Sequence, residues 1–241
     1  MAQRTVGLAI LKPVDRAAIL LRTSIFRDLS EQDVQELLPD LRERAYERGE
    51  SVWLEGDPAD SLFFVADGQL KSYRVSTDGA EVILGFNSAV DVMGEVGLFH
   101  PSGQRRVCVS AMEPTRCLTL DRARLLAFMT QHPMAMQRML ERLSTVAVRA
   151  AYSFSAVAFD DIRRRVAGAL LALADEFGEP TDQGVRIRLR LSQATLAALV
   201  AASRENVNRS LSSLVSTRVV SQRNGHFFVH DRTALEKASN L

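Results

Sequence analysis

The sequence predicts an α+β protein in which a β-rich N-terminal domain and a helical C-terminal domain are joined by one long helix. Three observations indicate this organisation. Short apolar runs separated by turn residues fill residues 50–121, apolar residues recur in a heptad through residues 134–159, and two amphipathic helical stretches adjoin each other in residues 191–215. The chain has 241 residues, of which 46% are hydrophobic, so it can bury two cores of ordinary size.

The N-terminal domain is predicted to be an antiparallel β-roll. Its apolar runs are short enough to be strands, and they are separated by turn residues such as Asp67-Gly68 and Asp78-Gly79. Runs and turns that alternate at this spacing favour antiparallel pairing. The predicted strands are Ser51–Leu54, Leu62–Val65, Leu70–Val75, Val82–Phe86, Val107–Ala111 and Cys117–Leu120.

One loop of this domain has the composition of a binding site for a small anion. Residues 94–106, GEVGLFHPSGQRR, open on Gly94 and Glu95 and end on the adjacent pair Arg105 and Arg106. Glycine backbones can approach phosphate oxygens, an arginine can neutralise the charge with two hydrogen bonds, and Glu95 can accept one from a sugar hydroxyl. The alternative is a surface loop with a single Glu–Arg salt bridge.

The stretch between the domains predicts a long helix, Met134–Phe159, with a dimer seam. Its apolar residues are spaced alternately four and three apart, and this 3.5-residue period is typical of a coiled coil. We therefore expect a parallel homodimer through this helix, the alternative being a core helix within a single chain. The predicted seam residues are Met136, Leu140, Leu143, Ala147, Ala150, Phe154 and Val157.

Residues 191–215 predict a helix-turn-helix. Ser192 is a good N-cap for the first helix, Ala201 and Ala202 form the turn, and Ser203 caps the second helix. The apolar residues of the second helix fall at i, i+4, i+7 and i+8 and are expected to point into the domain. They are Val207, Leu211, Leu214 and Val215.

The opposite face of the second helix has the chemistry of a DNA-reading surface. This face presents Arg204, Glu205, Asn208, Arg209 and Ser212. An arginine can pair with O6 and N7 of guanine, and a carboxylate can accept from N4 of cytosine, so the face suits a major groove. The alternative is an ordinary amphipathic helix whose charges are solvated.

A hairpin directly after this helix predicts a wing. Val219-Val220 and Phe227–Val229 are apolar runs on either side of Asn224-Gly225, which is the strongest short hairpin signal. Arg223 and His226 are expected at the tip, near a passing phosphate backbone. The C-terminal domain is therefore predicted to be a winged helix-turn-helix.

The distribution of charge favours a nucleic-acid partner for the C-terminal domain. The net charge of the chain is +1, but residues 162–241 carry 12 Lys and Arg against 7 Asp and Glu, whereas residues 1–161 carry 18 against 22. Part of the surplus is Arg186, Arg188 and Arg190, which alternate along a predicted strand, Val185–Leu191, and share one face of it.

The remaining features exclude several classes of protein. The apolar run Val6–Leu11 is too short for a membrane span and lacks a cleavage site, so we expect a cytoplasmic protein with no membrane partner. Cys108 and Cys117 are expected to be reduced, buried residues, although either could be the sensing thiol of a redox- or gas-responsive regulator. No metal site is predicted. Glu95 has no activated nucleophile or metal cluster beside it, so the sequence does not predict an enzyme.

The order of these features resembles the CRP/FNR family of bacterial transcription regulators over about residues 25–235. The matching strings are GEVGLF with Gln104-Arg105, FDDIRRRVAGALLALADEFG and LSQATLAALVAASRENVNRSL. The resemblance implies a cyclic-nucleotide-binding-like β-roll, a homodimer, a palindromic site in double-stranded DNA and RNA polymerase as a partner.

The resemblance also implies roles for individual residues of the helix-turn-helix. Arg204, Glu205 and Arg209 occupy the positions that read base edges. Ser192 and Gln193 occupy the start of the first helix, which contacts phosphates.

Glu95 and Arg105 match the residues that hold the ribose hydroxyl and the cyclic phosphate in members that bind cAMP, but other positions depart from that pattern. The hydroxyl residue that follows the family's arginine is Arg106 here. The two hydroxyl residues that grip adenine are Ala150 and Ala151, which cannot hydrogen-bond a base. Either the ligand is not cAMP, or it is held weakly, or the protein binds DNA without a ligand.

These observations predict a homodimeric, sequence-specific transcription regulator that requires no cofactor and has a cyclic nucleotide as a candidate effector. Ser203, Asn208 and Arg223 are expected to contact DNA together with the residues named above. Residues 1–24 are expected to be an N-terminal extension, 25–132 the β-roll sensor domain, 133–160 the dimerisation helix and hinge, and 161–241 the winged helix-turn-helix.

Overall fold

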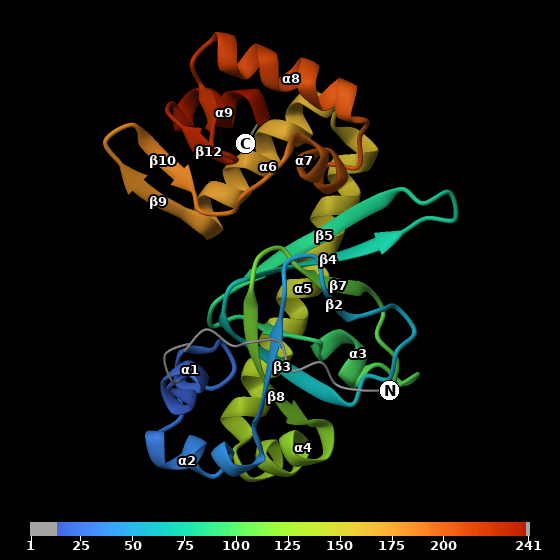
Figure 1. Ribbon diagram of the computed structural model, residues 1–241, viewed down its shortest axis with the longest axis vertical. Coiled ribbons are helices and arrows are strands. Elements are labelled where there is room, and N and C mark those ends of the chain that lie inside the picture. The colour runs from blue at the N-terminus through green and yellow to red at the C-terminus, as the bar shows by residue number, and fades with distance from the viewer. Residues whose placement is uncertain (1–13, 240–241) are drawn as a thin grey trace.

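The computed structural model describes residues 14–239 and contains three four-stranded antiparallel sheets in that range (Figure 1). Two of the sheets form the N-terminal domain, and the third belongs to the C-terminal domain. The α+β class and the order of β-roll, long helix and winged helix-turn-helix are confirmed. The apolar run Val6–Leu11 lies outside the described residues. None of the helices within 14–239 combines the length and apolarity needed to span a bilayer.

The two sheets of the β-roll contain the six predicted strands and two others. The first sheet has the order β1-β8-β3-β6 and the second has the order β2-β7-β4-β5. Their bounds are β1 Arg42–Tyr46, β2 Ser51–Trp53, β3 Ser61–Asp67, β4 Gln69–Val75, β5 Glu81–Ser88, β6 Val92–Met93, β7 Cys108–Ala111 and β8 Thr115–Asp121.

The apolar run of β3 reflects burial on both of its faces. Alternate side chains of a strand point to opposite sides of a sheet. Accordingly Phe63 and Val65 pack with Trp53 and Leu70 between the sheets, whereas Phe64 lies in a second core against the helices. The strands that the sequence does not predict carry weaker patterns, because β1 is a mostly exposed edge strand and β6 has two residues.

Short helices cover the outer face of the first sheet. They are α1 Arg16–Arg22, α2 Glu31–Gln35, the 3₁₀ helix η1 Leu38–Asp40, α3 Glu95–Phe99 and α4 Arg122–Gln131. Leu20 of α1 is fully buried in the same core as Phe64 and Phe128. The described part of the expected N-terminal extension therefore packs on the β-roll.

The long helix α5, Pro133–Phe159, runs behind the β-roll in the view of Figure 1 and continues toward the C-terminal domain. Proline is favourable at the start of a helix because its missing N–H has no partner to lose there. Ala135 and Met139 are buried in the β-roll core, and Leu143 packs against that core. No residue of α5 after Met139 is fully buried.

The C-terminal domain is a winged helix-turn-helix with one strand more than expected. Its sheet has the order β11-β12-β10-β9. The predicted strand Val185–Leu191 is wrong at its end, because pairing stops at Ile187 and the chain continues with Leu189 and Leu191 buried in the core. The elements are α6 Ile162–Phe177, β9 Gly178–Thr181, β10 Gly184–Ile187, α7 Gln193–Leu199, α8 Arg204–Ser216, β11 Val220–Arg223, β12 His226–Val229 and α9 Arg232–Ser239.

Candidate functional site

The helix-turn-helix has the caps that the sequence predicts. The Ser192 hydroxyl accepts a hydrogen bond from the Thr195 N–H at 3.0 Å, and the Ser203 hydroxyl accepts one from the Asn206 N–H at 3.3 Å. Each bond satisfies an N–H that the first turn of a helix leaves without a partner. The ends of α7 and α8 are therefore fixed locally, by residues that the sequence identifies.

Arg165 of α6 holds the turn between α7 and α8, a contact that no sequence motif marks. Its Nη1 donates to the carbonyl oxygen of Val200 at 2.7 Å and to that of Ala201 at 3.3 Å. These carbonyls lie at the C-terminal end of α7, where a cation is favourable. Arg165 thus ties the reading unit to the first helix of the domain.

The exposed face of α8 carries the predicted base-reading residues. Arg204, Glu205 and Arg209 are exposed, and Arg209 Nη2 lies 3.2 Å from Glu205 Oε1. α8 lies at the end of the C-terminal domain that is farthest from the β-roll (Figure 1). Val207, Leu211 and Leu214 are buried as predicted. The inward placement of Val215 is wrong, since 45% of it is exposed.

Val215 is exposed because it lines a groove beside the reading face. The groove has a volume of about 340 Å³ and brings together the start of α7, the middle of α8 and the wing. Asn208 is half-buried in it, and its Oδ1 has no hydrogen-bond partner. The lining residues are Gln193, Asn208, Leu211, Ser212, Val215, Gln222 and Phe227. Gln193 of α7 and Asn208 of α8, which are both predicted DNA contacts, thus line the same groove.

The wing forms as the Asn-Gly signal predicts. Asn224 and Gly225 have φ of 51° and 82°, and Arg223 pairs with His226 across the turn. Arg223 is exposed and donates to Gln183 Oε1 at 2.9 Å. His226 also lies beside the turn as predicted, and its Nδ1 lies 3.0 Å from the Ile187 carbonyl oxygen.

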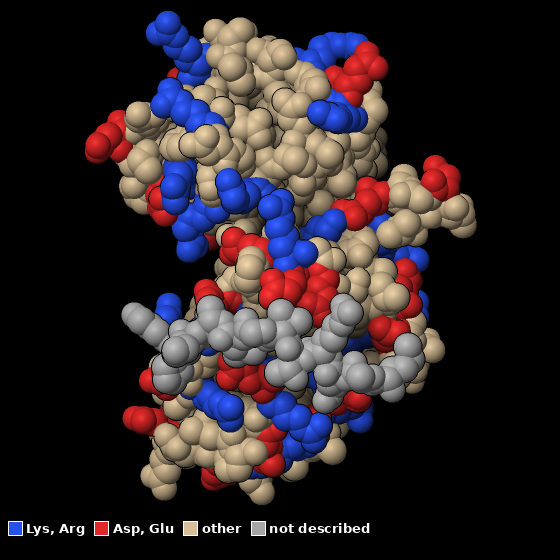
Figure 2. Space-filling view, in the orientation of Figure 1, with Lys and Arg blue, Asp and Glu red and all other residues tan. Residues whose placement is uncertain are grey.

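The surplus of positive charge is only partly available to a partner. Figure 2 shows Lys and Arg side chains along the edge of the C-terminal domain that faces acidic side chains of the β-roll. Arg186 pairs with Glu179 at 2.7 Å, and Arg232 pairs with Asp175 at 2.5 Å. The exposed arginines of α8 are therefore the more direct candidates for nucleic-acid contacts.

We define residues 94–106 as the effector cassette, and its Arg105 is buried. Only 3% of Arg105 is exposed, its Nη1 donates to the Gly94 carbonyl at 3.2 Å and its Nη2 to the Ser61 carbonyl at 2.8 Å. The guanidinium lies 4.2 Å from the centre of the Trp53 ring and 5.3 Å from that of Phe63. Burial lowers the pKa of Arg105. Gly94 has φ of 93°, and a Cβ there would collide with Arg105 Nη1.

Glu95 is also buried, and its partner comes from the long helix. It is 4% exposed, and its Oε1 accepts from Arg142 Nε at 2.8 Å. Arg142 Nη2 donates in addition to the Val92 carbonyl oxygen. Arg106, in contrast, is exposed. The fold therefore brings Gly94, Glu95 and Arg105 together and leaves Arg106 outside, while Arg142 is a member that the sequence does not predict.

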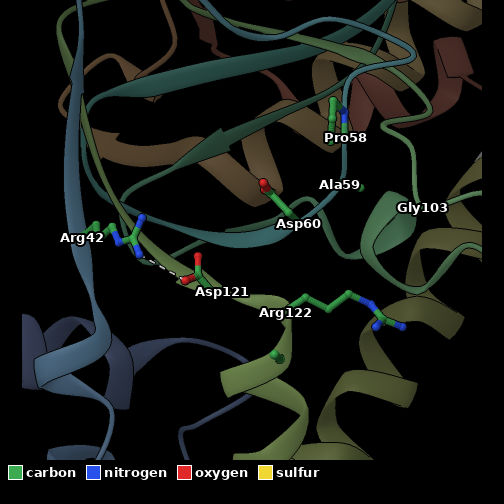
Figure 3. A pocket seen from close by; sticks show the side chains of 8 residues that line it. Arg42, Pro58, Ala59, Asp60, Gly103, Asp121 and Arg122 are labelled. Carbon is green, nitrogen blue, oxygen red and sulfur yellow. Dashed lines mark hydrogen bonds and ion pairs between the residues drawn. The ribbon is translucent and has the colours of Figure 1, made fainter.

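A shallow cavity of about 640 Å³ borders the cassette and has one cassette residue, Gly103, in its lining (Figure 3). Neither Glu95 nor Arg105 lines it. Its charged residues are engaged within the chain, because Arg42 pairs with Asp121 at 3.4 Å and Arg122 Nε donates to the Leu98 carbonyl at 3.0 Å. The lining residues are Arg42, Pro58, Ala59, Asp60, Gly103, Asp121, Arg122 and Ala123. This cavity is not the predicted ligand site.

Most of the predicted dimer seam faces solvent in the single chain. Leu140, Phe154 and Val157 are 61%, 76% and 51% exposed. Ala147 and Ala150 are exposed as well. The other two seam residues differ, because Met136 and Leu143 pack partly against the β-roll core of their own chain.

The two cysteines differ in their surroundings. Cys117 is fully buried, and burial raises its pKa to about 12, so the thiol stays protonated at neutral pH. Cys108 is half-buried, and its sulfur accepts from the Glu55 N–H at 3.3 Å. Within residues 14–239, no three His, Cys, Asp or Glu residues converge on a metal site.

Comparison with known proteins agrees with this architecture. The model of the cyclic nucleotide-binding domain matches residues 43–132, and that of the Crp-like helix-turn-helix domain matches residues 164–238. The chain is 32% identical to the CRP-like cAMP-activated global transcriptional regulator of Mycobacterium tuberculosis, over 80% of this chain and 86% of that protein. It is 29% identical to the cyclic AMP receptor protein of Thermus thermophilus, over 88% and 95%.

A solved structure of CLP from Xanthomonas campestris, described as a c-di-GMP-responsive global regulator, is also similar. It has a TM-score of 0.71 and 25% identity, over 83% of this chain and 99% of that one. The similarity to CLP thus extends over most of both chains. The chain belongs to the CRP/FNR family of transcriptional regulators.

Proposed function

We propose that the protein is a homodimeric regulator that binds a palindromic DNA site and does not require cAMP to do so. The observation that carries the proposal is the exposure of Arg204, Glu205 and Arg209 on α8, a helix that lies far from the β-roll (Figure 1). Arginine and glutamate at the start of such a helix can read guanine and cytosine edges in the major groove.

Ser192, Gln193, Ser203 and Arg223 are proposed to position the helix on the phosphates. They lie at the helix starts and on the wing, which are the places from which backbone contacts are usually made. Asn208 is proposed to complete the reading face from the neighbouring groove.

The homodimer is proposed to form through the exposed apolar seam of α5. A stripe with Leu140, Phe154 and Val157 exposed in the single chain gains burial when two copies pair. Two winged helices related by a two-fold axis then read half-sites about one helical turn apart. Contact with RNA polymerase and a cytoplasmic location are proposed from family membership.

The independence from cAMP is proposed from the residues around the effector cassette. Ala150 and Ala151 offer no hydrogen bond to a base, and Nη1 and Nη2 of Arg105 already donate to carbonyl oxygens, which leaves Nε as its donor without a partner within residues 14–239. Relatives differ in effector, since the mycobacterial protein is described as cAMP-activated and CLP as responsive to c-di-GMP. A redox role for either cysteine stays an alternative without a supporting contact.

Selection of binding sites from random DNA tests the proposal. The purified protein without added nucleotide is expected to enrich one inverted repeat. Light scattering of the complex is expected to give two chains per site. No enrichment in the absence and presence of cyclic nucleotides would contradict the proposed function.

A further inference from the structure

We propose that Arg142 is a built-in counter-ion of the effector cassette, and that it takes the place on Glu95 that a ligand hydroxyl would take. The side chain of Arg142, and not a bound ligand, then joins the sensor domain to the dimer helix. This inference rests on the proposed function, because it concerns how the sensor domain is held on the dimer helix of a DNA-binding regulator without an effector.

The contact has the geometry of a strong, partly buried ion pair. Arg142 Nε lies 2.8 Å from Glu95 Oε1, and the side chains are 20% and 5% exposed. Arg142 Nη2 also donates to the Val92 carbonyl. A buried carboxylate is costly unless it is paired, so Glu95 needs a donor in every state of the protein. In the single chain that donor is Arg142.

Arg105, the buried arginine of the cassette, is partly engaged by groups of the same chain. Arg105 donates to the carbonyl oxygens of Gly94 and Ser61 and is almost fully buried against Trp53. A phosphate group that approaches Nη1 or Nη2 competes with these carbonyls, whereas the buried Nε has no hydrogen-bond partner within residues 14–239. In the arrangement that the chain adopts, Oε1 of Glu95 is therefore the cassette atom whose ligand contact is replaced by a side chain of the protein. A ligand and the internal contacts compete for the same atoms.

Arg142 lies on α5 close to the last residues of that helix that pack on the β-roll, so its release would weaken the attachment of α5 to the sensor domain. Met139 is buried in the β-roll core and Leu143 packs partly against that core, whereas Ala147 and the seam residues after it are exposed. Arg142 is thus the charged contact at the point where the helix leaves the β-roll. A ligand that takes Glu95 must release Arg142, and the joint between sensor and dimer helix is then loosened.

Replacement of Arg142 by methionine tests the proposal, with Arg138→Met as the matched control. Both arginines lie on α5 and both are ion-paired, but Arg138 pairs with Asp28 and Glu141 instead of the cassette. Two quantities are measured for each protein: affinity for the selected palindrome without nucleotide, and affinity for cAMP and cGMP by titration calorimetry.

We expect Arg142→Met to bind DNA at least tenfold more weakly than the wild type and to bind cyclic nucleotides at least tenfold more tightly. Arg138→Met is expected to match the wild type in both. Arg142→Lys keeps the cation and is expected to lie between wild type and Arg142→Met. A role of Arg142 in stability alone would lower both affinities together, and it would not raise the affinity for a nucleotide.

Glu95→Gln removes the same ion pair by changing the other residue. It provides a second test in case Arg142→Met does not fold. It is expected to weaken DNA binding as Arg142→Met does, and the double variant is expected to be no weaker than either single one, because both remove the same contact. Wild-type DNA affinity in Arg142→Met, or unchanged nucleotide affinity, would overturn the inference. Binding of the palindrome by the wild type without nucleotide reports on the proposed function separately.

Discussion

Phe86 of β5 and Phe177 at the end of α6 lie edge to face, with ring centroids 6.5 Å apart and planes at 88°. Phe86 belongs to the β-roll and Phe177 to the winged helix domain, yet both lie in one apolar cluster with Ile83 and Leu196. The β4–β5 hairpin therefore extends the core of the C-terminal domain. Such a pair couples the two domains through packing, in addition to their connection through α5.

Phe86→Ala is expected to lower the free energy of unfolding by about 3 kcal/mol, because it removes a buried aromatic side chain from a shared core. Leu84 is the matched control, since it lies on the same strand but is 54% exposed. Leu84→Ala is expected to change stability by less than about 1 kcal/mol. Chemical denaturation of both variants measures the difference. Equal effects would mean that the hairpin does not share the core in solution.

Arg209→Ala is expected to weaken binding of the selected site by about 1 to 3 kcal/mol and to relax the preference at one base pair of each half-site. Arg209 is exposed on α8 and its guanidinium is held toward Glu205. Lys237→Ala removes a positive charge from α9 and is expected to leave the base preference intact. Gel shifts on a panel of single-base variants distinguish the two. A uniform loss at all sequences would assign Arg209 to phosphate contact.

Ala201→Gly is expected to stabilise the protein by about 1 kcal/mol, because Ala201 has φ of 48°, a left-handed conformation that disfavours side chains with a Cβ. A glycine is usual at this position of helix-turn-helix turns. Ala202→Gly, one residue later, has no such strain to relieve and is expected to destabilise. Thermal unfolding of the two variants should shift the midpoint in opposite directions.

Phe154→Asp is expected to prevent the proposed homodimer from forming, because it places a charge in the C-terminal part of the α5 seam. Leu143→Asp is a poorer test, since Leu143 packs partly on the β-roll core and its loss would also affect folding. Ser153→Asp adds the same charge beside the seam and is expected to leave the dimer unchanged. Light scattering gives the mass of each variant. A dimeric Phe154→Asp protein would place the interface elsewhere.

Asp91→Asn is expected to stabilise the protein at neutral pH. Burial raises the pKa of Asp91 above that of an exposed aspartate, while its Oδ2 accepts from the Ser88 N–H at 2.7 Å. A carboxyl with a raised pKa in the folded state favours folding only while it is protonated, so its contribution is lost as pH rises from about 4 through the folded pKa. The asparagine variant keeps the hydrogen bond without this loss.

Asp33 provides the opposite control. Hydrogen bonds from the Ser30 side chain and backbone lower the pKa of Asp33, so its contribution is present at neutral pH and is lost as pH falls through the folded pKa. Asp33→Asn is therefore expected to destabilise at neutral pH and to have little effect in acid. Unfolding measured from pH 3 to pH 7 compares the two variants. Parallel curves for both would contradict these assignments.

The sequence alone was sufficient for features that depend on local chemistry. Ser192 and Ser203 cap the two helices, and Asn224-Gly225 closes the wing, because caps and tight turns are determined by residues that are close in the chain. The strands of the β-roll with continuous apolar runs were also predictable. The edge strand β1 was not, because a strand exposed on most of its length carries no apolar pattern.

The tertiary structure decided which side chains contact residues that are distant in the sequence. This holds for charged and for apolar side chains. Glu95 and Arg142 are 47 residues apart, and no spacing rule predicts that α5 crosses the cassette at that turn. The heptad identified an apolar seam on α5. It did not reveal that Met136 and Leu143 pack partly against the β-roll core of the same chain. Local sequence patterns determine which face of an element is apolar or charged. Only the packing of elements determines what that face meets, because each contact depends on where the rest of the chain places its partner.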